Sequence, residues 1–305
     1  MIPLVAIVGA TGTGKTSLSI ELALELQARG HSCEIINADS MQLYRGMDIG
    51  TAKLEVENRH GIPHHLIDVL DVTEDSTVAG YQAMARTAIS EIRSRGSIPI
   101  MVGGSGLYIS SVIYDFKFPK TDPEIRARLE DELERNGALA LHEQLTKLDP
   151  EAARAIGKSN GRRLARALEV IELSGGTFGS GIPATANPRD NLIQFGIQVN
   201  RAELVERLNE RVNQMWESGL VAEVETLIPL GLEQGKTARK AIGYEQALKQ
   251  ISGELTEFEA IETARALTRR FARRQVSWFR RYDSILWLEG QNLVAQALAV
   301  TLSHV

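Results

Sequence analysis

The chain has 305 residues, which is about two domains of ordinary size, and 43% of them are hydrophobic, so it can bury a substantial core. Its formal net charge of −5 argues against a generally basic nucleic-acid binder, so any such site must be local. Cys33 is the single cysteine, which excludes a disulfide within the chain and a cysteine-based zinc site and fits a reducing cytoplasm.

The chain shows no sign of export or membrane insertion. Its first residues run directly into an expected strand, without the basic segment and cleavage site of a signal peptide. Its apolar runs all fall short of the roughly 18 residues that span a bilayer. We therefore expect a soluble cytoplasmic protein.

The first expected elements surround a phosphate-binding loop. The apolar run 4–8 predicts a buried parallel strand, and leucines at 18, 22 and 26 predict an amphipathic helix. The motif G-x-x-x-x-G-K-[ST] between them is formed by Gly9, Ala10, Thr11, Gly12, Thr13, Gly14, Lys15 and Thr16. Its backbone N–H groups and the helix N-terminus attract an anion. We expect Lys15 to reach a terminal phosphate and Thr16 to contact Mg²⁺, so the loop binds a di- or triphosphate.

Further apolar runs extend this pattern into an α/β fold with a parallel sheet. The expected strands are residues 33–37, 63–68 and 98–102. Ligands of such sheets bind beyond the carboxyl ends of the strands. Asp39, Ser105 and the phosphate loop all occupy this position, so we expect them to converge.

The stretch after the second strand carries the strongest sign of a functional site. Asp39, at a strand end, can serve Mg²⁺ through water, act as a general base, or cap a helix. Residues 43–53 are polar, contain two glycines and end on a lysine, and they fit neither an amphipathic helix nor an alternating strand. Irregular segments of this length beside a site are usually functional loops.

The segment after the fourth strand begins with two glycines and a serine. Gly103 and Gly104 allow a ligand to approach the backbone closely, and Ser105 supplies a hydroxyl. A small-molecule kinase would more often place an aspartate here to hold Mg²⁺. Its absence from residues 103–106 counts against ATP hydrolysis.

After residue 116 the sequence changes from alternating elements to charged helices. The expected helices are 123–136, 139–148 and 161–173, followed by a Gly/Ser/Thr/Pro-rich loop at 175–188, a strand at 192–199, helices from 201 to about 282, and a strand and helix within 287–304. We therefore expect a P-loop core in residues 1–115 with an inserted helical domain in 116–190. Residues 191–305 would complete the core and add C-terminal helices.

Residues 263–282 contain seven arginines and no acidic residue. One helical face, which predicts packing against the core, holds Leu267, Phe271, Trp278 and Tyr282. No acidic side chain lies three or four positions away within the run, so phosphate contact is favoured over a solvated face. A second basic cluster, Arg162, Arg163 and Arg166, begins the helix at 161.

These motifs together resemble the tRNA dimethylallyltransferase family over nearly the whole chain. The matching segments are 9–16, 39–53, 64–68, 103–108, 163–169, 243–244 and 268–280, of which 39–53 is the most specific. The resemblance implies a P-loop core with a helical insertion that grips the anticodon stem-loop of tRNA. It implies dimethylallyl diphosphate as donor, the adenosine 3′ to the anticodon as acceptor, Mg²⁺ as cofactor and no use of ATP.

The resemblance also implies roles for individual residues. Asp39 would be the general base on the adenine amino group, and Ser105, where the family usually has threonine, a second catalytic group. Residues 9–16 and Arg211 would bind diphosphate, and Thr16 the metal. The implied tRNA contacts are Asp39, Ser40, Met41, Gln42, Ser105, Arg126, Arg162, Arg163, Arg166, Arg273 and Arg274.

Two other functions stay open at this point. A small-molecule or nucleotide kinase would share the phosphate loop but would leave 39–53 and the arginine run unexplained. A non-enzymatic RNA-binding switch would explain the arginines but not Asp39 beside the loop. The resemblance favours the transferase. We expect a member of the bacterial type, since the zinc-finger extension of eukaryotic members is absent. We also expect a monomer.

Overall fold

The computed structural model describes residues 2–114, 116, 118, 119, 121–178, 188 and 191–305. The chain divides into two units: Met1–Asp115 with Pro188–Val305 form the first, and Phe116–Asn187 form the second. The expected boundaries at 115/116 and 190/191 lie within a few residues of these. The second unit is thus contributed by one continuous segment, and the first by the two segments that flank it.

A six-stranded parallel sheet forms the centre of the first unit, which confirms the predicted α/β class. The strands are β1 (Leu4–Val8), β2 (Cys33–Asn37), β3 (His64–His65), β4 (Ile98–Gly103), β5 (Leu192–Ile197) and β6 (Ile285–Leu288), in the order β3-β2-β4-β1-β5-β6. All five residues of β1 are buried, because both faces of a parallel sheet are covered. The strand predicted at 63–68 is only two residues long, and the last strand begins at residue 285 rather than 287.

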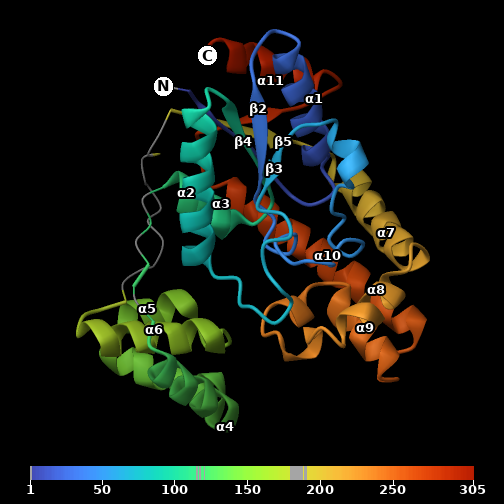
Figure 1. The fold of residues 1–305 in the computed structure, drawn as a ribbon. Helices are drawn as coiled ribbons and strands as arrows, with labels where there is room; N and C mark the ends of the chain where they lie inside the picture. The colour runs from blue at the N-terminus through green and yellow to red at the C-terminus, as the bar shows by residue number, and fades with distance from the viewer. Residues whose placement is uncertain (1, 115, 117, 120, 179–187, 189–190) are drawn as a thin grey trace. The chain divides into compact units, whose positions relative to one another are not determined.

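Helices cover both faces of the sheet (Figure 1). The chain steps from β1 to β2 in one direction and from β3 to β4 in the other, so right-handed crossovers place the intervening helices on opposite faces. On one face lie α1 (Lys15–Gln27) and α11 (Leu293–Leu302), and on the other α2 (Val78–Ser94) and α3 (Gly106–Ile113). The leucines predicted for the buried side of α1 belong to the core beside the sheet.

The remaining helices of the first unit build a second core beside the carboxyl ends of the strands. They are α7 (Arg201–Glu217), α8 (Leu220–Leu227), α9 (Tyr244–Ile251) and α10 (Glu257–Phe279), with the short turns η2 (Leu232–Gln234) and η3 (Ala238–Lys240). A further short turn, η1 (Val56–Arg59), has no buried residue. Tyr44 and Met47 are fully buried in this core with Leu220, Val224 and Tyr244. The irregular segment after β2 is therefore anchored to the C-terminal helices.

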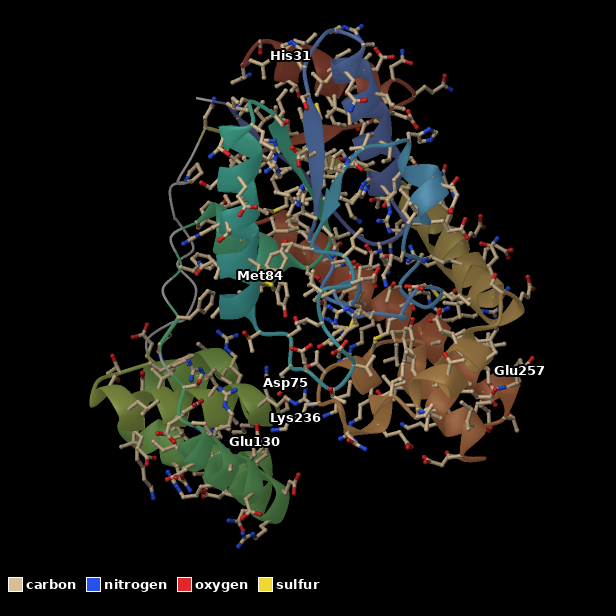
Figure 2. All side chains as sticks on the ribbon, viewed as in Figure 1. His31, Asp75, Met84, Glu130, Lys236 and Glu257 are labelled. Atoms are coloured by element: carbon tan, nitrogen blue, oxygen red, sulfur yellow. The ribbon has the colours of Figure 1, made fainter. Side chains whose placement is uncertain are left out.

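A hydrogen bond joins the segment before α2 to the connection between η2 and η3. Figure 2 labels Asp75, in the segment before α2, and Lys236, in the connection between η2 and η3. The hydroxyl of the adjacent Thr237 donates to the Asp75 carboxylate at 3.4 Å. The segment that leads into α2 thus contacts the C-terminal helices as well as the sheet.

The buried side of α10 differs from the prediction. Its fully buried residues are Ala260, Ala264, Ala272, Gln275 and Phe279, whereas Leu267, Phe271 and Trp278 are half-buried. Ala272 packs against Ala10 of the phosphate loop and Leu208 of α7, a close approach that a larger side chain would prevent. Neither α10 nor any other helix in the described part of the chain is long and apolar enough to cross a membrane.

The second unit is a small helical bundle with its own core. It contains α4 (Pro123–Leu148), α5 (Pro150–Ile156) and α6 (Gly161–Ser174), packed around Leu129, Leu141, Leu145, Leu164 and Leu168. Gly137, with a φ of 76°, breaks α4 between the two helices predicted there. The sequence analysis did not predict α5. Of the loop predicted at 175–188, residues 179–187 lie outside the described part of the chain.

Candidate active site

The phosphate loop connects β1 to α1 at the carboxyl edge of the sheet. Gly9, Gly12 and Gly14 have φ values of 146°, 81° and 91°, conformations that favour glycine. Gly14 is the N-cap of α1 and has no side chain to bond to the first helical N–H groups. These groups are therefore available to an anion at the positive end of the helix.

Lys15 places a cation inside this loop. Its Nζ donates to the carbonyl of Ala10 at 2.6 Å. Burial lowers the pKa of Lys15 to about 8, Asp39 opposes this shift, and Arg211 adds to it. The ammonium thus has a neutral carbonyl as partner in a desolvated position. A phosphate oxygen would be a stronger acceptor and would hold the proton on the lysine.

Asp39 follows β2 and is fixed by its own turn. One carboxylate oxygen accepts from the backbone N–H of Met41 at 2.9 Å, and the N–H of Asp39 donates to the Asn37 side chain at 2.9 Å. The Asn37 amide also donates to the carbonyls of Asp39 and Leu66. This turn leaves the half-buried carboxylate at the wall of a cavity.

Two cavities meet at Asp39. One, of about 210 Å³, contains Lys15 and Thr16, and Gln42 also lines it. The other, of about 270 Å³, has apolar walls that include Val212, Met215 and Phe271. The residues that line both are Thr11, Asp39, Thr51 and Arg211. The predicted neighbours Ser40 and Met41 line the larger cavity. A carboxylate therefore lies at the junction of a phosphate-binding space and an apolar one.

Arg211 reaches this junction from α7. Its guanidinium donates to the Thr11 hydroxyl at 3.2 Å and to the Thr51 carbonyl at 3.3 Å. Burial lowers the pKa of Arg211, and Asp39 opposes that shift. An arginine held beside the phosphate loop by two neutral acceptors can add a second cation to a bound anion.

The irregular segment after β2 forms a fixed wall of the site. The Lys53 side chain is only 4% exposed, and its ammonium bonds to the Tyr44 carbonyl at 3.0 Å, to the Asp68 carboxylate at 2.5 Å, and to Asp48. From α8, Glu223 accepts from the backbone N–H of Ile49 at 2.8 Å and from that of Asp48. These charged groups hold the segment in place rather than contact a ligand.

Positive φ values occur in this wall and in the segment after β3. Ala52 of the wall and Leu66 and Asp68 after β3 have φ values of 48°, 61° and 57°, and His60, outside the site, has one of 51°. Such conformations persist only where the surrounding contacts impose them, and they cluster at functional sites. Here the Lys53–Asp68 ion pair lies between the strained positions.

Ser105 lies behind the turn of Asp39 rather than at the cavity surface. Its hydroxyl accepts from the backbone N–H of Ser40 at 3.0 Å and donates to the Ser40 hydroxyl at 3.2 Å. Neither of the two cavities is lined by Ser105. The hydroxyl thus contacts Ser40 and not the Asp39 carboxylate, and the catalytic role that the resemblance implies for Ser105 stays a prediction.

Gln275 lies at this site although the sequence patterns do not single it out. Its side chain is buried in the middle of the arginine run, accepts from the Thr11 N–H at 2.8 Å and donates to the Gly104 carbonyl at 2.9 Å. It also lines the cavity of the phosphate loop. A polar residue on the buried side of an amphipathic helix was the available signal, because a buried amide needs partners.

The arginines of α10 do not form one uniform surface. Arg265 bonds to Glu262 and to Asn213, and Arg269 donates to Asn209 of α7 at 2.6 Å. Arg273 and Arg274 are exposed, and Arg274 lines the larger cavity beside Phe271. The expectation of an arginine run without partners thus holds for only part of it, because two side chains turn toward α7.

The arginines of the second unit also differ in their surroundings, since some are paired with a carboxylate and others are exposed. The buried carboxylate of Glu169 accepts from Arg126 and from Arg166, both at 2.8 Å. Burial raises the pKa of Glu169, but these hydrogen bonds outweigh it and bring the pKa below its ordinary value. Arg162 and Arg163 are exposed on the first turn of α6. Of the four arginines of this unit that were predicted to contact tRNA, Arg126 and Arg166 are thus bound within the unit.

The site suits a magnesium ion that arrives with a phosphate ligand. No cluster of three His, Cys, Asp or Glu side chains that could hold a metal occurs in the described residues. Mg²⁺ commonly binds one or two protein groups and fills its other positions with phosphate oxygens and water. The exposed hydroxyl of Thr16 and the carboxylate of Asp39 line one cavity and fit that pattern.

The sequence and fold are similar to those of known proteins. Residues 42–282 match the family described as IPP transferase. A tRNA dimethylallyltransferase of Clavibacter sepedonicus is 56% identical over 294 residues, covering 96% of this chain and 95% of that protein. One from Thermobifida fusca is 52% identical and covers 100% of this chain and 96% of its own length.

Two solved structures share the fold. The tRNA isopentenylpyrophosphate transferase of Bacillus halodurans has a TM-score of 0.72 at 39% identity, covering 99% of this chain and 95% of that one. A eukaryotic dimethylallyltransferase, described as acting on tRNA, has a TM-score of 0.78 at 27% identity, covering 96% and 75%.

Proposed function

The chain belongs to the IPP transferase family, and we propose that it is a tRNA dimethylallyltransferase. It transfers the dimethylallyl group of dimethylallyl diphosphate to N6 of the adenosine 3′ to the anticodon of certain tRNAs, and diphosphate leaves. The observation that carries this proposal is the place of Asp39, at the junction of the phosphate-loop cavity and the apolar cavity. A carboxylate there lies between a donor and an acceptor that enter from different sides.

Asp39 supplies the base that this reaction needs. The lone pair of the adenine amine is delocalised into the ring, so the amine is a poor nucleophile until its proton is taken. N6 attacks C1 of the dimethylallyl group, the bond from C1 to the diphosphate oxygen breaks, and the N6 proton passes to the Asp39 carboxylate. The Met41 N–H fixes one carboxylate oxygen during this transfer.

Cations and helix dipole stabilise the leaving group. Negative charge grows on the diphosphate as the C–O bond breaks. We propose that Lys15, Arg211 and the N-terminus of α1 neutralise it, since all three lie at the phosphate loop. We propose that Thr16 holds Mg²⁺ together with the diphosphate, and the ion would add charge neutralisation there. No phosphoryl transfer is required of this arrangement.

The larger cavity suits a base that has left its stack. Phe271, Val212 and Met215 provide apolar surface, and Arg274 adds a cation at the same wall. A base in a single-stranded loop is extruded at low cost and is commonly held against aromatic or arginine side chains. The anticodon stem-loop is therefore the substrate partner that we propose, with the enzyme acting as a cytoplasmic monomer.

One assay tests the proposal against a kinase or ATPase. The protein is incubated with labelled dimethylallyl diphosphate or with ATP, each with and without tRNA that has adenosine 3′ to its anticodon. We expect label in tRNA only when donor and tRNA are both present, and no ADP. A tRNA with guanosine at that position is the matched control and should stay unlabelled. ADP release in step with product, or no transfer, would overturn the proposal.

A further inference from the structure

Three segments that lie far apart in the sequence meet at one buried amide. Gln275 of α10 is 4% exposed. Its Oε1 accepts from the N–H of Thr11 in the phosphate loop at 2.8 Å, and its Nε2 donates to the carbonyl of Gly104 after β4 at 2.9 Å. One side chain thus joins the donor-binding loop to the neighbouring strand end.

The amide fits closely against Gly104. A Cβ at Gly104 would lie 2.2 Å from Nε2 of Gln275, so the amide occupies the space that a side chain there would need. A buried amide is costly unless its donor and acceptor are both bonded, whereas an apolar residue would fill the volume without that cost. The packing on adjacent turns is done by Ala272 and Phe279. Gln275 therefore contributes geometry that apolar packing would not.

The carbonyl that Gln275 holds belongs to the turn that supports Asp39. The neighbouring Gly103 abuts Ala38 so closely that a Cβ would lie 2.2 Å from the Ala38 carbonyl oxygen. The N–H of Ser105 donates to that same carbonyl at 3.3 Å, and its hydroxyl holds the N–H of Ser40. Ala38 and Ser40 flank Asp39, so the backbone around the carboxylate is set by the turn at 103–105.

We propose that Gln275 is a positioning residue that keeps the phosphate loop and the turn of Asp39 in a fixed position relative to each other. The inference rests on the proposed function, in which the loop fixes the donor and Asp39 takes the acceptor proton. Gln275 acts through Thr11 and Gly104, because both polar atoms of its amide are bonded to them. Transfer needs donor carbon and amine at near-attack distance, and an error of about 1 Å can cost on the order of 10²-fold in rate.

The test replaces the amide while keeping its length. Gln275→Met has similar volume and loses both hydrogen bonds, and Phe279→Leu is the control, a buried change on the same helix that touches neither bond. The single-turnover rate is measured at saturating dimethylallyl diphosphate and tRNA, with the KM of each substrate, the melting temperature, and hydrogen exchange of residues 9–16 and 103–106.

We expect Gln275→Met to lower the single-turnover rate at least about tenfold, to leave the KM for tRNA within about twofold, and to speed exchange in both segments. Phe279→Leu should lower the melting temperature and keep the wild-type rate. A wild-type rate in Gln275→Met, or a rate loss in Phe279→Leu that matches its loss of stability, would overturn the proposal.

A second variant covers the case in which Gln275→Met does not fold. Gln275→Glu keeps an acceptor for the Thr11 N–H but has no donor for the Gly104 carbonyl when ionised. Exchange should then rise at 103–106 and stay low at 9–16, with a reduced rate, and unchanged exchange with an unchanged rate would refute the inference. If the wild-type protein transfers nothing, the proposed function fails, and the exchange measurements still decide whether Gln275 links the two segments.

Discussion

Cations at the cavities of the first unit and cations in the core of the second unit have different partners. Lys15 and Arg211 of the first unit bond to neutral carbonyl or hydroxyl oxygens and line a cavity. In the second unit, Arg126 and Arg166 close on the buried carboxylate of Glu169. A cation whose partner is a neutral oxygen can exchange it for a phosphate, whereas a cation paired with a buried carboxylate stabilises the fold.

The partner of a charged side chain predicts whether its mutation changes catalysis, binding or stability. Changes at the cavity should slow the transfer step or weaken donor binding. Changes in the ion-paired network of the second unit should alter its stability and leave the transfer step alone. Removal of the exposed arginines of α10 should weaken tRNA binding more than donor binding.

Asp39→Asn should lower the single-turnover rate on the order of 10²–10⁴-fold, because the amide keeps the shape but accepts no proton. Binding of both substrates should stay near the wild-type level, which equilibrium binding to labelled tRNA and donor would check. A variant that keeps more than about a third of the wild-type rate would remove Asp39 from the mechanism, and with it the assignment of chemistry to the cavity junction.

Lys15 should make donor capture depend on pH. Because burial lowers its pKa to about 8, the free protein carries the charged ammonium below that pH and loses it above. The kcat/KM for dimethylallyl diphosphate should fall about tenfold per unit above pH 8, while kcat at saturating donor stays flat because bound diphosphate retains the proton. In Lys15→Ala we expect kcat/KM to be about 10²-fold lower and not to fall further above pH 8. If kcat/KM of Lys15→Ala fell with the same midpoint as in the wild type, the titration would belong to another group.

The double variant Arg273→Ala/Arg274→Ala should raise the KM for tRNA and flatten its dependence on salt. Each lost phosphate contact on a single strand should lower the slope of log affinity against log salt by about 0.7. The KM for the donor should change little. Arg269→Ala is the control, since Arg269 bonds to Asn209 and should not alter the slope. A large rise in the donor KM with an unchanged slope would assign these arginines to the leaving group.

Ser105→Ala should slow transfer by roughly three- to tenfold, because a neutral hydrogen bond contributes about 0.5–1.5 kcal/mol and the hydroxyl supports Ser40 rather than Asp39. Ser105→Thr should be nearly neutral. Single-turnover rates of both variants provide the test. If threonine were as damaging as alanine, the position would depend on side-chain size rather than on the hydroxyl.

Glu169→Gln should destabilise the second unit by about 1–2 kcal/mol without changing the single-turnover rate. The figure is modest because both arginines remain partly exposed. The pKa of Glu169 in the folded state is below its ordinary value, so its contribution is complete at neutral pH and is lost as the pH falls through the acid range. Hydrogen exchange of residues 121–178, compared between the wild type and Glu169→Gln at neutral and at acid pH, measures this loss of stability. An equal loss at the two pH values would contradict the explanation by charge.

Local patterns predicted the central elements well. The strands predicted at 4–8 and 33–37 match β1 and β2 residue for residue. Strands buried on both faces favour continuous apolar sequence, as in β1, whereas β2 also buries Glu34 and Asn37. The phosphate loop was recognised because its glycines are needed for local backbone conformations. The short β3 and the helix α5 carried weaker signals, since two residues of strand and seven of helix leave little periodicity to detect.

The partners of charged side chains could not be read from sequence spacing. Arg269 and Asn209 are 60 positions apart, and Arg126 and Glu169 are 43 apart, so each pair forms only through helix packing. A rule that searches three or four positions along one helix misses both. For the same reason the arginine run appeared uniform in sequence, although the structure divides it between α7, the larger cavity and solvent.

The sequence alone determined the phosphate loop, the parallel sheet and the family, because each depends on residues close together in the chain or on the order of its motifs. Only the tertiary structure decided which side chains meet. Asp39 lies where two cavities join, and Ser105 lies behind the turn of Asp39. Gln275 lies between Thr11, 264 positions away in sequence, and Gly104, 171 positions away. Hydrogen bonds of buried groups are set by how helices and strand ends pack, and that packing depends on the whole chain at once.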